Sequence, residues 1–274
     1  MKFLCYFFLF SFLYAEEESI LKKILKNEEM IISVAASYEP YYIANPKKGF
    51  PGFEVEIAEK YAEFLGVKIG KIIPLNNFAE HAKAIEEGTI DIALGNSTNL
   101  ARIKQVYFSD PYEIVSPGAL VNRLIMPPEE EGNVVLNKNF RNILDLKNIS
   151  RITFGVKDKT SNVDFIKNNF EGYPIITFKN DIEAVKALKE NRFNCYVADN
   201  LYLEGLLQKE SSLKVGYLPL LGTVTEKQLS FAFKKYDVQL QASINLFIRE
   251  MKRTGEIERL KQKYFYSDGW VKKN

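Results

Sequence analysis

Met30-Ile-Ile-Ser-Val-Ala35 is a short apolar run that predicts a buried strand, and it opens the stretch that decides the fold. A loop rich in proline, glycine and tyrosine follows it. The next segment has the periodicity of a helix that ends at Gly66, with an apolar face formed by Ile57, Ala58, Tyr61, Phe64 and Leu65. Strand and helix patterns then alternate as far as residue 94. This alternation predicts a mainly parallel sheet flanked by helices.

A second block of the same kind covers residues 151–208, where three strand patterns alternate with three helical ones. Two such blocks predict an α/β protein with two lobes and a cleft between them. Small molecules bind to α/β proteins in clefts outside the carboxyl ends of the strands. The sequence therefore predicts a ligand site between the lobes.

The composition narrows the chemistry of this site. The chain has 274 residues, and its 37 Lys and Arg nearly balance its 35 Asp and Glu, so the charge does not favour nucleic-acid binding. His81 is the single histidine, and Cys5 and Cys195 are the two cysteines. This excludes a Cys/His metal cage and a disulfide scaffold, and we expect no metal and no cofactor. We expect His81 on the solvated face of a helix and Cys195 in the core.

The first fifteen residues have the form of a secretory signal, with Lys2, an apolar run of about a dozen residues, Ala15 and then three glutamates. The run is shorter than the roughly 20 residues that span a bilayer, although an uncleaved anchor is the alternative. We therefore expect residues 1–15 to be a signal peptide and the mature protein to be periplasmic, with no membrane span. Cleavage would remove Cys5, which leaves one cysteine and no internal disulfide.

Four segments carry a resemblance to a known family. They are Gly52-Phe-Glu-Val-Glu-Ile-Ala58, Gly95-Asn-Ser-Thr-Asn-Leu-Ala-Arg102 followed by Phe108-Ser-Asp-Pro-Tyr112, Gly155-Val-Lys-Asp-Lys-Thr-Ser161, and Arg192-Phe-Asn-Cys-Tyr-Val-Ala-Asp199. They resemble the family-3 extracellular solute-binding proteins, the polar-amino-acid receptors of ABC importers. The resemblance implies the type II periplasmic-binding-protein fold. It places lobe one at residues 28–117 and 222–274 and lobe two at residues 118–221, joined by a two-segment hinge.

The resemblance also implies which residues hold a ligand. In this family the residues that match Gly95, Ser97 and Arg102 hold the α-carboxylate of an amino acid, and a guanidinium with backbone amides is well suited to a carboxylate. Asp199 matches the acid that holds the ammonium group. The alternatives are a solvated helix position for Arg102 and a helix N-cap for Asp199.

Two further groups complete the implied site. Lys157, Thr160 and Ser161 form the strand-to-helix loop of lobe two, which the family uses on the ligand. Tyr38 and Phe78 match the aromatic residues that wall the ligand's aliphatic stem, with plain core packing as the alternative.

Two positions favour a particular class of ligand. Ala35 replaces a residue that is often acidic in the family, so a basic ligand would lack one partner. Lys157 would repel a distal positive charge. We therefore expect glutamine or an acidic amino acid rather than lysine, arginine or histidine.

Together these features predict a monomeric periplasmic receptor that delivers a free amino acid to the permease of an ABC transporter and has no catalytic residues. One alternative is a secreted enzyme on the same scaffold, similar to cyclohexadienyl or prephenate dehydratase, which would need a general acid in the cleft. Another is a ligand sensor that docks on a chemoreceptor.

Overall fold

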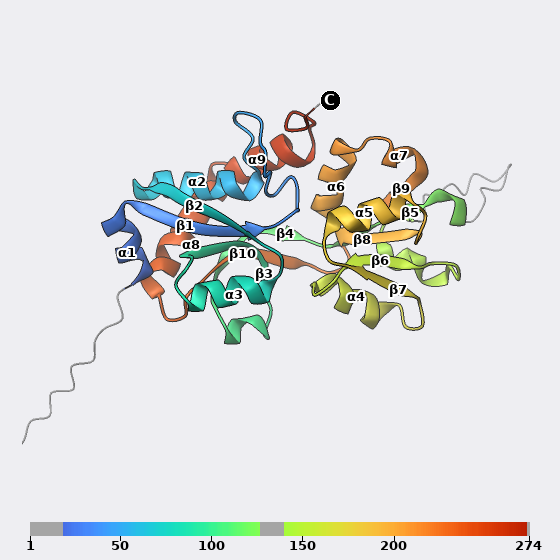
Figure 1. The fold of residues 1–274 in the computed structure, drawn as a ribbon, viewed down its shortest axis with the longest axis horizontal. Helices are drawn as coiled ribbons and strands as arrows, with labels where there is room; N and C mark the ends of the chain where they lie inside the picture. The colour runs from blue at the N-terminus through green and yellow to red at the C-terminus, as the bar shows by residue number, and fades with distance from the viewer. Residues whose placement is uncertain (1–18, 127–139, 273–274) are drawn as a thin grey trace, which may run out of the picture.

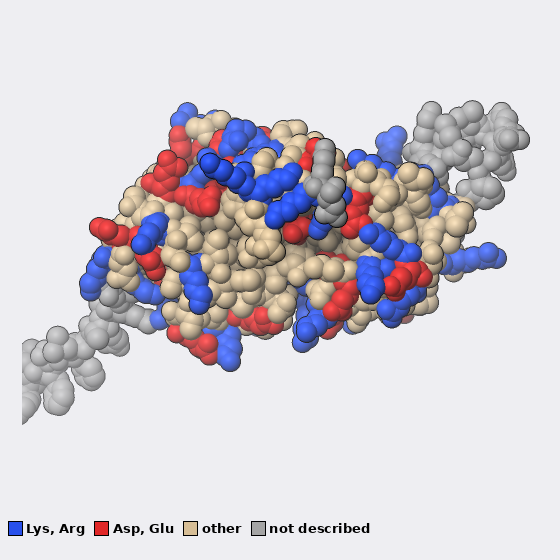
Figure 2. Space-filling model, turned by 45° about the horizontal axis from the view of Figure 1, so that its top comes forward, with Lys and Arg blue, Asp and Glu red and all other residues tan. Residues whose placement is uncertain are grey.

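The computed structural model describes residues 19–126 and 140–272 (Figure 1). The predicted signal peptide, residues 1–15, lies outside the described residues. Within the described ranges, the helices are too short or too polar to cross a membrane. Figure 2 shows Lys and Arg interspersed with Asp and Glu over the visible face, so charge of one sign does not gather there.

The first sheet has five strands in the order β2-β1-β3-β10-β4. They are β1 (Glu29–Ala35), β2 (Lys68–Leu75), β3 (Ile92–Ser97), β4 (Tyr107–Val115) and β10 (Lys227–Phe233). β1 pairs in parallel with β2 and β3, whereas β10 runs antiparallel to β3 and β4. Four strands therefore end at one edge of the sheet, and β10 begins at that edge.

Helices with one apolar face cover this sheet, and α2 and α3 lie on opposite sides of it (Figure 1). α2 (Phe53–Leu65) ends at Gly66, whose φ of +71° is a left-handed conformation that favours glycine. α3 (Phe78–Glu86) begins after Asn77, whose side chain accepts the N–H of Glu80. The remaining helices of this part are α1 (Ile20–Asn27), α8 (Val238–Arg253) and α9 (Glu256–Phe265).

The second sheet repeats this design in the order β7-β6-β8-β5-β9. Its strands are β5 (Pro117–Asn122), β6 (Phe154–Lys157), β7 (Ile175–Phe178), β8 (Cys195–Asp199) and β9 (Tyr217–Leu220). β6 pairs in parallel with β7 and β8, and β5 runs antiparallel to β8 and β9. The helices around it are α4 (Ser161–Asn169), α5 (Asp181–Lys189), α6 (Asn200–Lys209) and α7 (Leu213–Gly216), with 3-10 turns η2 (Arg123–Ile125) and η4 (Ile143–Asn148).

Each sheet with its helices forms one lobe, and the predicted α/β fold with two mainly parallel sheets is confirmed. We call the lobe of the first sheet lobe one and that of the second sheet lobe two. The chain passes between them at Ser116 and again through residues 221–226. The buried Oγ of Ser116 accepts the N–H of Val224 at 2.9 Å and that of Thr225 at 3.3 Å. One hydroxyl therefore ties the two connecting segments into a hinge.

The lobes also touch beside the hinge, where α6 of lobe two meets the loop after β1. Gly205 lies so close to Pro40 that a Cβ atom on Gly205 would stand 2.4 Å from the proline Cδ. The exposed Lys209 and the half-buried Glu39 form an ion pair across the same contact, with Nζ and Oε2 2.5 Å apart. Lobe two therefore rests directly on lobe one.

Candidate ligand-binding site

A cavity of about 110 Å³ lies between the lobes, at the edges where parallel strands of both sheets end. Every residue that the sequence analysis assigned to a ligand borders this cavity: Tyr38, Phe78, Gly95, Ser97, Arg102, Lys157, Thr160, Ser161 and Asp199. The first five come from lobe one and the last four from lobe two. The structure thus brings the predicted residues together from both sides of one gap.

Arg102 is held rigidly at the lobe-one wall of the cavity. It starts the 3-10 turn η1 (Arg102–Lys104), shortly after β3. Its Nη1 donates to the carbonyl oxygen of Ser97 at 2.9 Å and to Ser97 Oγ at 2.8 Å, and its Cζ lies 4.4 Å from the ring centre of Phe78. Burial lowers the pKa of Arg102 from 12.5, but a guanidinium remains charged at neutral pH. Within the described residues its Nε and Nη2 have no protein acceptor, so they are available for an anion.

Gly95 makes room for a buried carboxyl group. Its φ is +73°, and a Cβ atom there would lie 2.9 Å from Oε2 of Glu54. The N–H of Gly95 donates to Oη of Tyr112 at 3.0 Å, and Tyr112 in turn donates to Oε1 of Glu54 at 2.6 Å. The amide of Gly95 is therefore engaged within lobe one, and the role of this glycine is to let the chain pass close to Glu54.

Glu54 borders the cavity and was missed by the sequence analysis. Its side chain is 1% exposed, and its Oε2 has no hydrogen-bond partner among the described residues. Burial raises its pKa from 4.5 to about 7. Its burial could have been predicted from the helical periodicity, because Glu54 stands three, four and seven residues before the apolar positions 57, 58 and 61 of the same helix face.

Asp199 borders the cavity from lobe two, whereas Arg102 borders it from lobe one. Asp199 lies at the end of β8 and is the N-cap residue of α6, as the alternative has it, but its side chain makes no capping hydrogen bond. Its Oδ2 accepts from Tyr38 Oη at 3.1 Å, and its Oδ1 accepts from Asn162 Nδ2 at 3.2 Å. The carboxylate is thus oriented by hydrogen bonds from both lobes.

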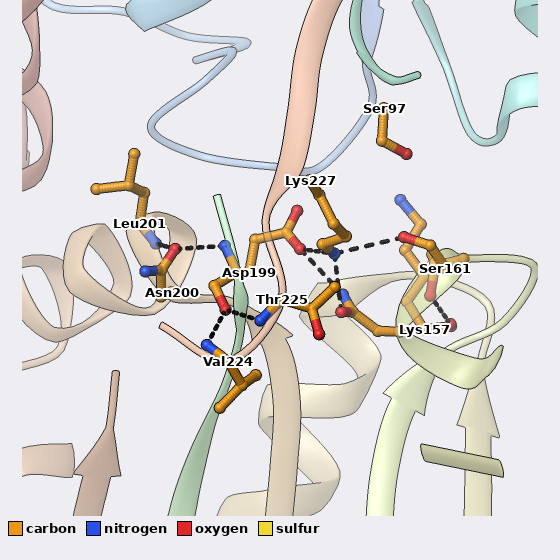
Figure 3. Close-up of polar contacts among 12 residues, drawn as sticks. Ser97, Lys157, Ser161, Asp199, Asn200, Leu201, Val224, Thr225 and Lys227 are labelled. Atoms are coloured by element: carbon orange, nitrogen blue, oxygen red, sulfur yellow. Dashed lines mark hydrogen bonds and ion pairs between the residues drawn. The ribbon is translucent and has the colours of Figure 1, made fainter. Parts of the chain in front are cut away.

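Lys227, which the sequence analysis also missed, occupies the space in front of Asp199 (Figure 3). It is the first residue of β10, so it stands at the edge where the parallel strands end. Its Nζ forms an ion pair with Asp199 and donates to Asn162 Oδ1 at 2.9 Å and Ser161 Oγ at 3.4 Å. No local pattern distinguishes this lysine, since its position depends on the return of the chain from lobe two to lobe one.

The loop between β6 and α4 also lines the cavity from lobe two. Lys157 is 8% exposed, and its Nζ lies 3.5 Å from Oδ2 of the buried Asp181. Burial raises the pKa of Asp181, and the nearby Lys157 charge opposes that rise. Thr160 Oγ1 donates to the Lys157 carbonyl at 2.9 Å, which fixes the loop, while Ser161 Oγ points toward Lys227.

The two predicted aromatic walls have definite partners. Phe78 lies beneath the guanidinium of Arg102. Tyr38 lies between Tyr41 and Tyr202, with ring centres 5.1 Å and 4.2 Å away, and its hydroxyl bonds Asp199. Both rings therefore pack in the structure and also position the charged groups that border the cavity.

The expectation that His81 is solvated is wrong. Its side chain is 3% exposed, because α3 turns the face with His81, Ala82 and Ile85 toward the sheet. Its Nδ1 lies 2.7 Å from Oγ of Ser33 on β1, and burial lowers its pKa from 6.5 to about 4. Cys195 is buried, as predicted. The described residues contain no group of three or more Asp, Glu, His and Cys that could hold a metal ion.

Two α/β lobes, a hinge of two segments and a cavity lined from both sides define a two-lobed ligand-binding protein. Residues 30–267 match the bacterial extracellular solute-binding proteins, family 3, and the chain belongs to this family. The fold is that of the type II periplasmic binding proteins.

Curated relatives match most of the chain at low identity. The chain is 24% identical to the L-cystine-binding protein TcyJ of Escherichia coli K12 over 254 residues, which cover 92% of this chain and 88% of TcyJ. It is 27% identical to the arginine-binding extracellular protein ArtP of Bacillus subtilis over 243 residues, with 87% and 86% covered. A shorter match, 32% identical over 97 residues and 35% of each chain, is with cyclohexadienyl dehydratase of Pseudomonas aeruginosa.

Solved structures give the same fold. The ancestral amino acid-binding protein AncCDT-1, a precursor of cyclohexadienyl dehydratase, matches with a TM-score of 0.72 at 25% identity, over 90% of this chain and 100% of that chain. A putative binding component of an ABC transporter from Wolinella succinogenes, complexed with lysine, matches with a TM-score of 0.74 at 23% identity, over 89% and 98%.

Proposed function

We propose that this protein is a periplasmic receptor that binds a free polar amino acid in the interlobe cavity and delivers it to an ABC-transporter permease. The observation that carries the proposal is that Arg102 of lobe one and Asp199 of lobe two border the same cavity. A free amino acid has a carboxylate and an ammonium group at one end, so it needs a cation and an anion that face each other across a short gap. The similarity to a cystine-binding protein and an arginine-binding protein supports an amino acid as the ligand class.

The binding sequence follows from which groups are already fixed. Arg102 is held in place by Ser97 and Phe78, so it can bind the α-carboxylate before the lobes move. Asp199 then meets the ammonium group from the other lobe. Because the ligand contacts both lobes, it binds the closed arrangement more tightly than an open one, and this differential affinity drives closure. A closed shape is what a permease would recognise.

Calorimetric titration of the mature protein with the twenty amino acids tests this proposal. We expect binding of glutamine, glutamate or aspartate. Arg102→Ala should weaken it at least about tenfold, because a hydrogen bond to a charged group contributes about 1.5–3 kcal/mol. Arg151→Ala is the matched control, since Arg151 is exposed and outside the cavity. Binding that survives Arg102→Ala unchanged would contradict the proposed site.

One observation favours a second candidate, an enzyme similar to the dehydratases. A carboxyl group with a pKa of about 7 and an oxygen without a partner, as in Glu54, is suited to a general acid at the cavity wall. The test is turnover of prephenate and arogenate. We expect none, because Arg102 and Asp199 account for the site as a receptor. Conversion that is abolished in Glu54→Gln or Asp199→Ala would replace the receptor proposal.

A further inference from the structure

Lys227 holds the position that the proposed function gives to the ligand's ammonium group. Its Nζ pairs with Asp199, and the two side chains are only 12% and 15% exposed. The same ammonium also donates to Asn162 Oδ1 and Ser161 Oγ. In Figure 3 it reaches from β10 of lobe one between Asp199 and Ser161 of lobe two. The carboxylate is therefore already neutralised from within the chain.

The balance of charge around the cavity is positive near Asp199. Lys227, Lys157, Lys159 and Arg102 border the cavity as cations. Asp199 and Asp181 are the opposing carboxylates, and burial keeps Glu54 partly protonated at neutral pH. A neutral amino acid brings one cation and one anion, so it leaves this excess of positive charge unchanged.

A ligand ammonium that binds Asp199 comes next to Lys227 or displaces it. Either event leaves a largely buried lysine ammonium without a full counter-charge, which opposes binding. A second anionic group on the ligand removes this cost, because it can pair with Nζ of Lys227 while the ligand's ammonium pairs with Asp199. An uncharged amide in the same place gives a weaker interaction.

We propose that Lys227 is a specificity-determining residue that selects amino acids with an anionic side chain over their neutral amides. The inference rests on the proposed function and narrows it from polar amino acids to acidic ones. Lys227 contacts the ligand's distal acid in this arrangement, and Arg102 contacts its α-carboxylate. Selectivity therefore comes from the first residue of β10, just after the hinge, rather than from the residues that hold the α-carboxylate and the ammonium group of the ligand.

The test measures affinities of wild-type protein and Lys227→Met for glutamate, glutamine, aspartate and asparagine by calorimetry. We expect wild-type protein to bind each acid at least tenfold more tightly than its amide. In Lys227→Met the ratio should fall at least tenfold, because the acid loses a partner while the ammonium site at Asp199 becomes free. Lys227→Arg should keep the preference. Lys71→Met, which removes an exposed charge on β2 outside the cavity, should leave the ratio unchanged.

The outcomes separate this inference from the proposed function. If Lys227→Met strengthens or weakens acids and amides equally, Lys227 is only an interlobe tie and the inference is overturned, while the receptor function stands. If wild-type protein binds no amino acid, the proposed function fails and the inference fails with it. Lys227→Gln keeps a hydrogen-bond donor near Asn162, so it provides a second variant if Lys227→Met does not fold. Circular dichroism checks both.

Discussion

The rings of Tyr38 and Tyr202 stack across the two lobes, with their centres 4.2 Å apart and their planes within 2° of each other. Tyr38 belongs to the loop after β1, and Tyr202 belongs to α6 of lobe two. The hydroxyl of Tyr38 donates to Asp199, so the stack is continuous with the candidate site. The contact between the lobes and the orientation of Asp199 therefore depend on the same side chain.

The close approach of Gly205 to Pro40 gives the first prediction, which concerns lobe contact. Gly205→Ala places a Cβ 2.4 Å from Pro40 Cδ, so α6 must move away from lobe one. Because alanine favours the helix itself, we expect stability of lobe two to be kept while affinity for the amino acid falls at least tenfold. Calorimetry measures the stability and the affinity, and small-angle scattering of the liganded protein measures the movement of lobe two away from lobe one.

Gly216→Ala is the matched control for this prediction. A Cβ atom at Gly216 meets no heavy atom within 4 Å, and this residue lies at the end of α7, outside the cavity. Its affinity should equal that of the wild-type protein. An affinity loss shared by both variants would show that general helix changes, rather than the contact with Pro40, are responsible.

The second prediction concerns the buried carboxyl of Glu54. Its pKa is about 7 in the folded protein against 4.5 ordinarily, so the folded state holds this proton more tightly than the unfolded chain does. The stability that this group contributes is therefore present below pH 4.5 and is lost as the pH rises through 7. The full effect is on the order of 3 kcal/mol.

Glu54→Gln isolates this effect, because glutamine keeps an acceptor for Tyr112 but does not titrate. The slope of the free energy of unfolding against pH, measured with urea between pH 5 and 8, should be more positive in the variant than in the wild-type protein. Comparing slopes cancels any constant cost of the amide group. Parallel curves for the two proteins would mean that Glu54 is already ionised at pH 5.

The fold was largely predictable, because most elements have a strong local pattern. The strand at residues 30–35 and the helix that ends at Gly66 were both expected and are β1 and α2. The strands around the hinge gave weaker signals. β4 contains Pro111, β5 begins at Pro117 and β9 contains Pro219, and proline interrupts the pattern by which a strand is recognised.

The residues of the candidate site that belong to a local sequence motif were predictable. Those that reach the site only through the tertiary fold were not. Arg102 and Asp199 follow recognisable strands, so their meeting at one edge follows from the fold. Lys227 stands opposite Asp199 only because β10 inserts between β3 and β4 in the reverse direction. Glu54 and His81 are buried because of the faces that α2 and α3 turn to the sheet. The sequence analysis expected His81 on a solvated face and made no prediction for Glu54.

The last prediction uses the fact that His81 is the single histidine of the chain. Its ring protons can be assigned in a proton NMR spectrum without further labelling, and their shifts should titrate with a midpoint near pH 4, because burial lowers the pKa from 6.5. In urea-unfolded protein the midpoint should return to about 6.5. A midpoint near 6.5 in the folded protein would contradict the burial of this ring against Ser33.

The pKa of His81 also has a consequence for stability, opposite in sign to that of Glu54. The folded-state pKa is depressed, so its contribution to stability is present above pH 6.5 and is lost as the pH falls through 4, by about 3 kcal/mol in all. Between pH 4.5 and 6.5 the slopes from His81 and Glu54 oppose each other. His81→Gln should therefore make the unfolding free energy fall more steeply with rising pH in this window, whereas Glu54→Gln should make it rise. The double variant Glu54→Gln/His81→Gln should return the slope close to that of the wild-type protein. If the slope of the double variant instead matches that of either single variant, one of the two groups does not titrate between pH 4.5 and 6.5.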